Sequence, residues 1–257
     1  RPPHGPIGCF CGCHADGRAS SRFKLRLKVQ HELDPHRVPR IGMDFLEARM
    51  NFFEAACRGD VDTLRDLLEE HDLESETDGC GRTPLHYAIA NRRHGAVNFF
   101  LEKWSNIEHR SDAGHTPLHT ALLWGDVICV YLLVEAGAEV DVEMGGITPL
   151  GFVLEPDCRL FRRLSASYKP EALRMTVKML IKAGASVDDF HRYKNAVYRP
   201  LHLAWNSRHG HLLPMLLEQG ARVAGSSHPV DPALQALVDA VAAAPRWINY
   251  AKMHKRV

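Results

Sequence analysis

Cysteine and histidine side chains, which bind transition metals readily, gather near the start of the chain. Cys9, Cys11, Cys13 and His14 all fall within the stretch CFCGCH, and thiolate and imidazole groups are ligands that zinc and copper favour. Zinc sites usually combine a closely spaced pair of cysteines with a second, distant pair, and the sequence offers no second pair. We therefore predict no metal here and interpret the stretch as a turn or flexible segment, with metal binding and thiol chemistry as alternatives.

Histidine also recurs at a fixed place in a repeated tetrapeptide. TPLH occurs twice and is followed by the related forms TPLG and RPLH. The four copies begin at Thr83, Thr116, Thr148 and Arg199, which gives spacings of 33, 32 and 51 residues. Three copies end in a histidine: His86, His119 and His202. Because the repeat fixes their position, these histidines are predicted to be structural, and no catalytic or metal-binding set is assigned to them.

The tetrapeptide has the chemistry of a helix start. A threonine hydroxyl at the N-cap accepts a hydrogen bond from an open backbone N–H, and proline suits the first helical position, where no N–H is needed. The leucine supplies the first buried contact, and the histidine can bond a neighbouring backbone group while its ring packs. In the second unit the pattern predicts one helix over about 84–91 and another over about 96–103.

Glycine marks the two ends of each unit. A glycine two residues before the threonine in three copies suits a turn with positive φ. Another follows the second apolar segment, as in LLVEAGAEVD and MLIKAGASVD, and suits a helix C-terminus. A unit of turn, helix, short turn and helix cannot bury both apolar stripes alone, so the units are predicted to stack as a solenoid.

The stretches GRTPLHYAIAN, GHTPLHTALLWGD and LLVEAGAEVD resemble the ankyrin repeat, a β-turn and two antiparallel helices. The resemblance extends over residues 52–228. It implies an all-α solenoid of stacked helix-turn-helix units with β-turn or hairpin connections, preceded by a non-repeat N-terminal segment.

We divide the chain accordingly into three parts. Residues 1–45 form a basic, cysteine-containing and partly flexible extension, in which the alternating stretch RFKLRLKVQ predicts a strand over 22–29. Residues 46–228 form an array of about five units. Residues 229–257 form a capping helix and a basic tail.

The fourth unit departs from the repeat. Its tetrapeptide ends in Gly151, so the hydrogen bond of the histidine side chain is predicted to be lost there. An insertion near 155–172 then lengthens the unit, with Pro156 ending the first helix early, and such insertions map to loops on one face of an array. The basic stretch RLFRRL within the insertion is interpreted as a solvated loop with a local anchor or, alternatively, as a loop that contacts a partner.

Aromatic residues mark two further departures. The long turn SVDDFHRYKNAVYRP places Phe190, His191, Tyr193 and Tyr198 beside cations, which is typical of interface anchors, with core packing of one ring as the alternative. Trp104 stands where other units have glycine. Because a bulky residue does not adopt positive φ cheaply, we predict that Trp104 packs against the neighbouring helix.

Charge is unevenly distributed along a chain whose formal net charge is only +1. Residues 1–45 carry eight Lys/Arg and four Asp/Glu, residues 246–257 carry four Lys/Arg and no acid, and the remainder carries 20 basic and 27 acidic residues. An acidic body does not favour nucleic-acid binding. No apolar run is long enough for a membrane span, and seven cysteines without a disulfide pattern favour a reducing compartment, the cytoplasm or the nucleus.

The resemblance implies that the turn tips and the outer face of each first helix form a concave surface for a protein partner. Together with the long aromatic turn, the residues assigned to partner binding are Arg82, Asn91, Arg110, Asp112, His115, Leu123, Trp124, Tyr193, Tyr198 and Asn206. Trp124 is the strongest single candidate because tryptophan is enriched at interface hot spots. Packing between helices is the alternative for this residue.

These features predict a non-catalytic scaffold or adaptor that binds a protein partner, on its own or within a larger complex, and needs no cofactor. No nucleotide-binding loop or nucleophile motif is visible, and no small-molecule ligand is expected. A substrate receptor for a ubiquitin ligase is one version of this function, although the C-terminal residues do not clearly resemble the box that such receptors carry. The alternatives are an enzyme or metal-binding regulatory protein that uses the Cys/His stretch and the insertion, and nucleic-acid binding through the basic ends.

Overall fold

The computed structural model describes residues 40–104, 106–155, 169–193, 196–207, 209–223 and 231–243. The cysteine-rich stretch, the strand over 22–29, most of the insertion and the basic tail lie outside these residues, so the predictions made for them stay predictions. The chain divides between Phe100 and Leu101 into an N-terminal and a C-terminal compact unit, each of which contains several repeat units. Each unit has its own set of packed helices.

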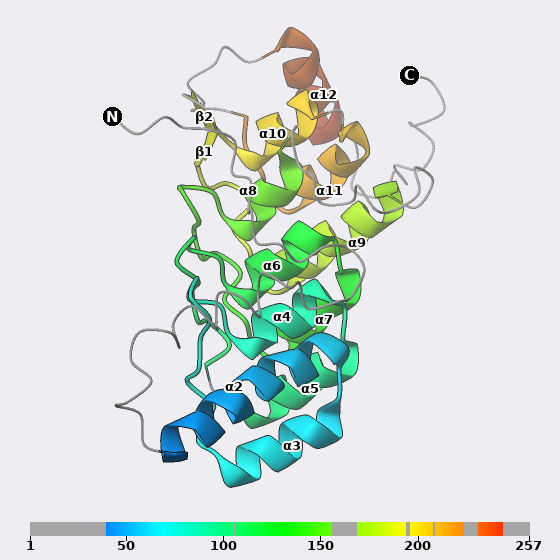
Figure 1. Ribbon diagram of the computed structural model, residues 1–257. Coiled ribbons are helices and arrows are strands. Elements are labelled where there is room, and N and C mark those ends of the chain that lie inside the picture. The colour runs from blue at the N-terminus through cyan, green and yellow to red at the C-terminus, as the bar shows by residue number, and fades with distance from the viewer. Residues whose placement is uncertain are drawn as a thin grey trace, which may run out of the picture. The chain divides into compact units, whose positions relative to one another are not determined.

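The N-terminal compact unit contains α2 (Arg40–Arg58), α3 (Val61–Glu70), α4 (Pro84–Ala90) and the first residues of α5 (His94–Lys103). Helix α2 packs against both α3 and α4 (Figure 1). Phe53 of α2 is buried and meets Tyr87 of α4 edge to face, with 5.4 Å between ring centroids. Burying such a side chain contributes about 1.5–3 kcal/mol, so this contact stabilises the packing of α2 against α4.

Helix α2 also bears on the division of the chain. It begins at Arg40 and runs without a break to Arg58, so the position between residues 45 and 46 lies inside a helix. Phe52 and Ala56 are fully buried one helical turn apart on this helix.

The C-terminal compact unit continues with further helix pairs. Its elements are α6 (Pro117–Trp124), α7 (Val127–Glu135), α8 (Pro149–Leu154), α9 (Lys169–Lys182), β1 (His191–Tyr193), β2 (Ala196–Tyr198), α10 (Pro200–Asn206), the 3-10 turn η1 (Gly210–Leu212), α11 (Leu213–Glu218) and α12 (Pro232–Ala243). Helices α6 and α7, α8 and α9, and α10 and α11 pack in pairs, and α7 packs on α9 as α8 packs on α10. The predicted stacking of helix pairs is confirmed (Figure 1).

A short antiparallel hairpin is the strand structure found among the described residues. Strands β1 and β2 pair with His191 opposite Tyr198 and Arg192 opposite Val197. The hairpin leads directly into α10, in line with the predicted hairpin connections. None of the described helices is long and apolar enough to span a membrane.

All four tetrapeptides begin a helix whose first residue is the proline. Thr83 and Thr116 are extended N-caps. The Nδ1 of His86 accepts a hydrogen bond from Thr83 N at 3.2 Å, and the Nδ1 of His119 accepts one from Thr116 N at 3.4 Å. Both histidines are buried, so they satisfy a backbone donor at the helix start while packing in the core.

The fourth tetrapeptide lacks the bond from its own histidine, as predicted, because Gly151 has no side chain, but its backbone donor is still bonded. Thr148 N donates to the Nδ1 of His191, from β1, at 3.4 Å, and His191 is fully buried. A Cβ atom on Gly151 would lie only 2.4 Å from that nitrogen. Glycine is therefore needed at position 151 because a histidine from another segment fills the space.

The first helix of the fourth unit ends early, as predicted. Helix α8 ends at Leu154, and Glu155 has extended backbone with φ −62° and ψ 142°, the conformation favoured by a residue before proline. Trp104 is only 7% exposed. In α12, which was predicted as a closing helix, Leu234 is fully buried, so this helix packs through its apolar side.

Candidate functional site

The turn tips of the C-terminal compact unit lie on the same side of its stacked helices (Figure 1). They are the turn 110–115 before α6, the turn 143–147 before α8 and the β1–β2 hairpin before α10. Arg110 Nη1 donates to Glu143 O at 3.1 Å, and Arg192 N donates to Gly146 O at 3.0 Å. Because hydrogen bonds join each tip to the next, we name these three segments the tip row.

Each of the first two tips is also closed by bonds of its own. Ser111 N donates to His115 O at 3.0 Å, Gly114 N donates to Ser111 O at 2.7 Å, and Met144 N donates to Ile147 O at 2.9 Å. Turns fixed in this way hold their exposed side chains in place. Such preorganisation reduces the conformational entropy that a protein loses when it binds a partner.

The predicted site residues of the tip row differ in exposure. Arg110 and Asp112 are exposed, and Tyr198 is half-buried. His115 is only 9% exposed, and burial lowers its pKa, so it presents a small neutral surface. Tyr193 is the last residue of β1. The row therefore offers Arg110, Asp112 and Tyr198 as its accessible predicted residues.

The remaining predicted site residues of the C-terminal compact unit lie at the ends of the first helix of a repeat unit. Leu123 and Trp124 are the last two residues of α6, and both are half-buried. Gly125 then ends the helix in the left-handed conformation, with φ 61°. Asn206 is exposed at the last position of α10. These ends present an apolar surface at α6 and a polar one at α10.

Arg82 and Asn91, the predicted site residues of the N-terminal compact unit, make hydrogen bonds within that compact unit. Arg82 Nη2 donates to Asp78 Oδ2 at 2.6 Å and to Tyr87 Oη at 2.7 Å. Burial alone would raise the pKa of the Asp78 carboxyl, but hydrogen bonds and charge from Arg82 outweigh it and hold that pKa below its ordinary value. Asn91 Nδ2 donates to Tyr87 O at 2.8 Å. Both side chains shape the ends of α4, and Arg82 keeps a side-chain exposure of 25%.

Successive repeat units are joined by acidic residues for which no role was predicted. A carboxylate oxygen of one unit accepts a backbone N–H of the next, and the pairs are Glu108 with Glu139, Asp141 with Ser186, and Asp188 with Arg222, at 2.8, 3.0 and 3.0 Å. The signal that could have found them is an acid placed directly after an apolar residue in NIE, EVD and SVD. Burial raises the pKa of Glu108, although the bond from Glu139 N opposes this.

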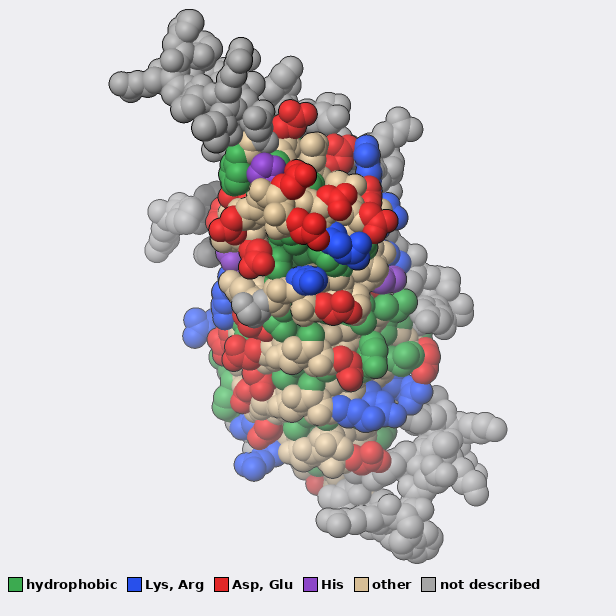
Figure 2. Space-filling view, turned by 90° about the horizontal axis from the view of Figure 1, so that it is seen from below, with side chains coloured by type: hydrophobic (Ala, Val, Ile, Leu, Met, Phe, Trp, Pro, Cys, Tyr) green, Lys and Arg blue, Asp and Glu red, His purple; other side chains and the backbone are tan. Residues whose placement is uncertain are grey.

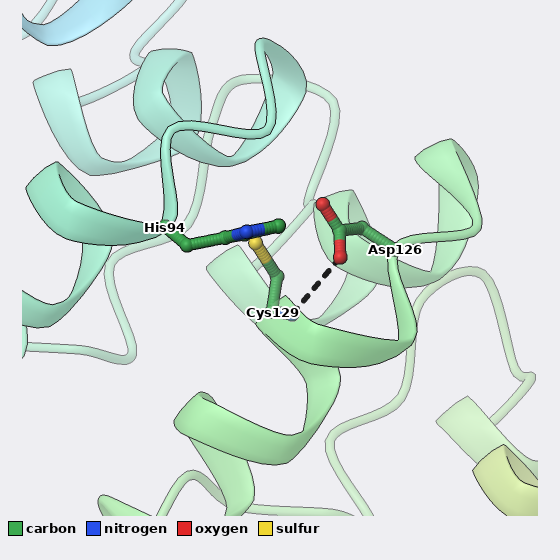
Figure 3. A group of neighbouring side chains, drawn as sticks. All are labelled: His94, Asp126 and Cys129. Carbon is green, nitrogen blue, oxygen red and sulfur yellow. Dashed lines mark hydrogen bonds between the residues drawn. The ribbon is translucent and has the colours of Figure 1, made fainter. Parts of the chain in front are cut away.

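Asp126 is likewise committed to the fold. Its Oδ1 accepts hydrogen bonds from Ile128 N and Cys129 N, both at 3.1 Å, at the start of α7 (Figure 3). Figure 3 also draws His94, the first residue of α5. Among the described residues of the C-terminal compact unit, Asp126 and Cys129 supply two potential ligands, fewer than the three or four protein ligands of a zinc site. This pair therefore carries no metal assignment.

Acidic side chains gather on the face that Figure 2 shows from below, with basic side chains between them. The exposed acids of helix α3 and the loop after it are Asp62, Asp66, Glu69, Glu70, Asp72 and Glu74. Arg65 pairs with Asp62 at 3.1 Å. Helix α3 and the loop after it therefore form an acidic surface.

Known proteins share the repeat seen in the fold. The family model described as ankyrin repeats, in three copies, matches residues 52–144. The human Ankyrin repeat and SOCS box protein 16 is 29% identical over 225 residues, which cover 75% of this chain and 48% of that protein. The Probable E3 ubiquitin-protein ligase XBOS32 of Oryza sativa subsp. japonica is 29% identical over 185 residues, which cover 66% of this chain and 37% of that protein.

A shorter match joins the chain to the RelA-associated inhibitor of Mus musculus, which is 30% identical over 97 residues, 36% of this chain and 12% of that protein. The chain therefore spans no more than 48% of the length of these three relatives. The match with the human protein extends well beyond the three repeats of the family model, since it covers 75% of the chain.

Proposed function

Since the chain belongs to the ankyrin-repeat family, we propose that it is a non-catalytic scaffold or adaptor that binds a protein partner through the tip row and the ends of its first helices. Ankyrin repeats imply protein–protein interaction, and stacked repeats create extended binding surfaces. The proposal places the protein in the cytoplasm or the nucleus, in keeping with cysteines that follow no disulfide pattern.

The observation that carries the proposal is the linked tip row. Arg110 and Asp112 are exposed on a turn that is closed by its own hydrogen bonds and tied to the next turn. Trp124 is half-buried at the end of the helix that this turn begins. Arginine and tryptophan are enriched at interface hot spots, so Arg110 and Trp124 are the residues expected to contribute most to binding.

We also propose that the chain works as a subunit of a larger complex. One relative is named for a SOCS box, and another is named as a probable ubiquitin ligase. Both names favour an adaptor that brings a bound protein to a ligase assembly. In this version the tip row holds the protein to be delivered, and contacts outside the tip row join the assembly.

The test compares three forms of the full chain as bait in a quantitative affinity capture from cell lysate. One is wild type, one carries Trp124→Ala with Arg110→Ala, and the third carries Tyr131→Ala. Tyr131 is a suitable control because it is an aromatic residue, 49% exposed, on the second helix α7. Loss of two hot-spot side chains of about 2 kcal/mol each predicts at least a tenfold weaker capture of the specific partner.

The control variant is expected to capture that partner as wild type does. Thermal unfolding of all three baits shows that each is folded before capture is compared. Equal capture by wild type and the double variant would remove the tip row from the binding surface and overturn the proposal.

A further inference from the structure

The fourth unit keeps a histidine at its helix start although its own tetrapeptide lacks one. In the second and third units the ring belongs to the tetrapeptide itself, with Thr N to His Nδ1 distances of 3.2 and 3.4 Å. In the fourth unit Thr148 N donates at 3.4 Å to His191, which lies 43 residues farther along the chain. The same backbone donor is therefore satisfied by the same ring nitrogen from a different segment.

The absence of a side chain at Gly151 leaves space for this ring at the start of α8. A Cβ atom on Gly151 would meet His191 Nδ1 at 2.4 Å, Cγ at 2.6 Å and Cε1 at 2.7 Å. Real Cβ atoms do not approach other heavy atoms so closely, because interiors are packed at van der Waals distances. His191 is fully buried there. A side chain on residue 151 and the ring of His191 thus exclude one another.

A second contact holds the same strand to the same unit. Arg192 N donates to Gly146 O at 3.0 Å, and a Cβ atom on Gly146 would lie 3.3 Å from Arg192 Cβ. Two glycines of the stretch GGITPLG therefore lie against two consecutive residues of β1. Strand β2 is fixed in turn by pairing with β1.

The chemical state of the ring suits a permanent contact at neutral pH. Because Nδ1 accepts from Thr148 N, the proton of the neutral ring is on Nε2. Burial lowers the pKa of His191 to about 4, and the charge of Asp189 opposes this only in part. The ring is therefore uncharged at pH 7 and keeps its acceptor.

We infer that His191 is a positioning residue that latches the β1–β2 hairpin onto the start of α8 and so sets the orientation of the hairpin in the tip row. The hairpin carries the half-buried Tyr198 and follows Phe190, which is 48% exposed and stacks on the Arg199 guanidinium at 4.3 Å. The latch is a property of the fold. Only its consequence for partner binding rests on the proposed function.

The test separates the cap of α8 from the position of the hairpin. Four forms of the full chain are compared by hydrogen–deuterium exchange and thermal unfolding: wild type, His191→Ala, Gly151→His with His191→Ala, and His119→Ala. Gly151→His restores the sequence TPLH, so its own ring can bond Thr148 N once His191 has been removed. His119→Ala is the matched control because it removes an ordinary tetrapeptide histidine far from the hairpin in sequence.

We expect His191→Ala to speed exchange at least tenfold in peptides covering both 148–154 and 188–199. In the double variant we expect exchange over 148–154 to return to the wild-type rate while 188–199 stays at least tenfold faster. His119→Ala should speed exchange at the start of α6 and leave 188–199 unchanged. A merely structural histidine would be replaced fully by Gly151→His, so wild-type protection of 188–199 in the double variant would overturn the latch.

Failure of the latch and failure of the proposed function give different results. Affinity capture with the double variant adds the functional arm. Hairpin release with unchanged capture would leave the latch standing and would remove the hairpin from the binding surface. A hairpin that stays protected in His191→Ala would overturn the latch whatever the capture shows.

Discussion

The tetrapeptide histidines act through the geometry of the neutral ring. In His119 the Nδ1 accepts from Thr116 N, and burial, helped by the charges of His115 and Arg110, lowers the pKa to about 4. An unfolded histidine titrates near pH 6.5. Between about pH 4 and pH 6.5, His119 is therefore neutral in the folded chain and protonated in the unfolded chain.

This difference fixes the sign of a pH effect on stability. Above pH 6.5 both states are neutral at this residue, and its contribution is complete. As the pH falls from 6.5 to about 4, the unfolded state alone binds a proton, and the free energy of unfolding falls by an amount on the order of 3 kcal/mol for this residue. His119→Asn, whose amide oxygen can accept from Thr116 N but does not titrate, should unfold in urea with a shallower pH dependence over this range. An identical pH dependence in the two forms would contradict this assignment.

Arg92 occupies a backbone conformation that glycine occupies in the next unit. It has φ 56°, whereas Gly125, at the equivalent end of α6, has φ 61°. A side chain in the left-handed region costs about 1 kcal/mol. Arg92→Gly should therefore raise the free energy of unfolding by up to about 1 kcal/mol in urea denaturation.

Gly125→Ala is the matched change in the opposite direction and should lower the free energy of unfolding by about 1 kcal/mol. If Arg92→Gly destabilises the chain as much as Gly125→Ala does, a side chain in the left-handed conformation does not lower the free energy of unfolding at position 92.

At the scale of the element, helix starts could be predicted because their chemistry is local. Each tetrapeptide holds a proline and a buried leucine, preceded by threonine in three of the four copies, and α4, α6, α8 and α10 all begin at the predicted proline. The capture of His191 by the fourth unit could not be predicted. No local pattern links Gly151 to a residue 40 positions away, and the link exists only once the hairpin packs against α8.

The exposure of the site residues could not be predicted from the sequence for a similar reason. Asp112 and His115 share one tight turn, yet Asp112 is exposed and His115 is buried. Which residues of a turn face the solvent depends on how the next unit packs against it. The resemblance could assign both residues to a surface, but it could not rank them.

The acidic residues between units contribute at this scale as well. Asp141 Oδ1 accepts from Ser186 N at 3.0 Å and ties the end of one unit to the next. A hydrogen bond to a charged group contributes about 1.5–3 kcal/mol. Asp141→Ala should therefore lower the free energy of unfolding by about 2 kcal/mol in chemical denaturation.

Asp112→Ala is the control for that measurement, because Asp112 is exposed on a turn tip. It should change stability by no more than about 0.5 kcal/mol. Equal stability of the Asp141 and Asp112 variants would show that the carboxylate adds nothing to the joint between units.

At the level of the whole molecule, the fold is supported by several observations, whereas the function depends on which side chains the fold presents. The family model, the relatives and the stacked helix pairs all give ankyrin repeats. A repeat surface can accept many partners, since function depends on the side chains placed on the fold. The proposed function therefore requires that the partner contacts the tip row.

Site-specific photo-crosslinking shows whether the partner contacts the tip row. A photo-crosslinking residue is placed in the full chain either at Asp112, on the tip row, or at Tyr131, on α7, and crosslinked partners are identified after irradiation in cells. Both positions are exposed, so access alone does not favour one. We expect the specific partner to crosslink from position 112 and not from 131. Crosslinking of that partner from 131 and not from 112 would contradict it.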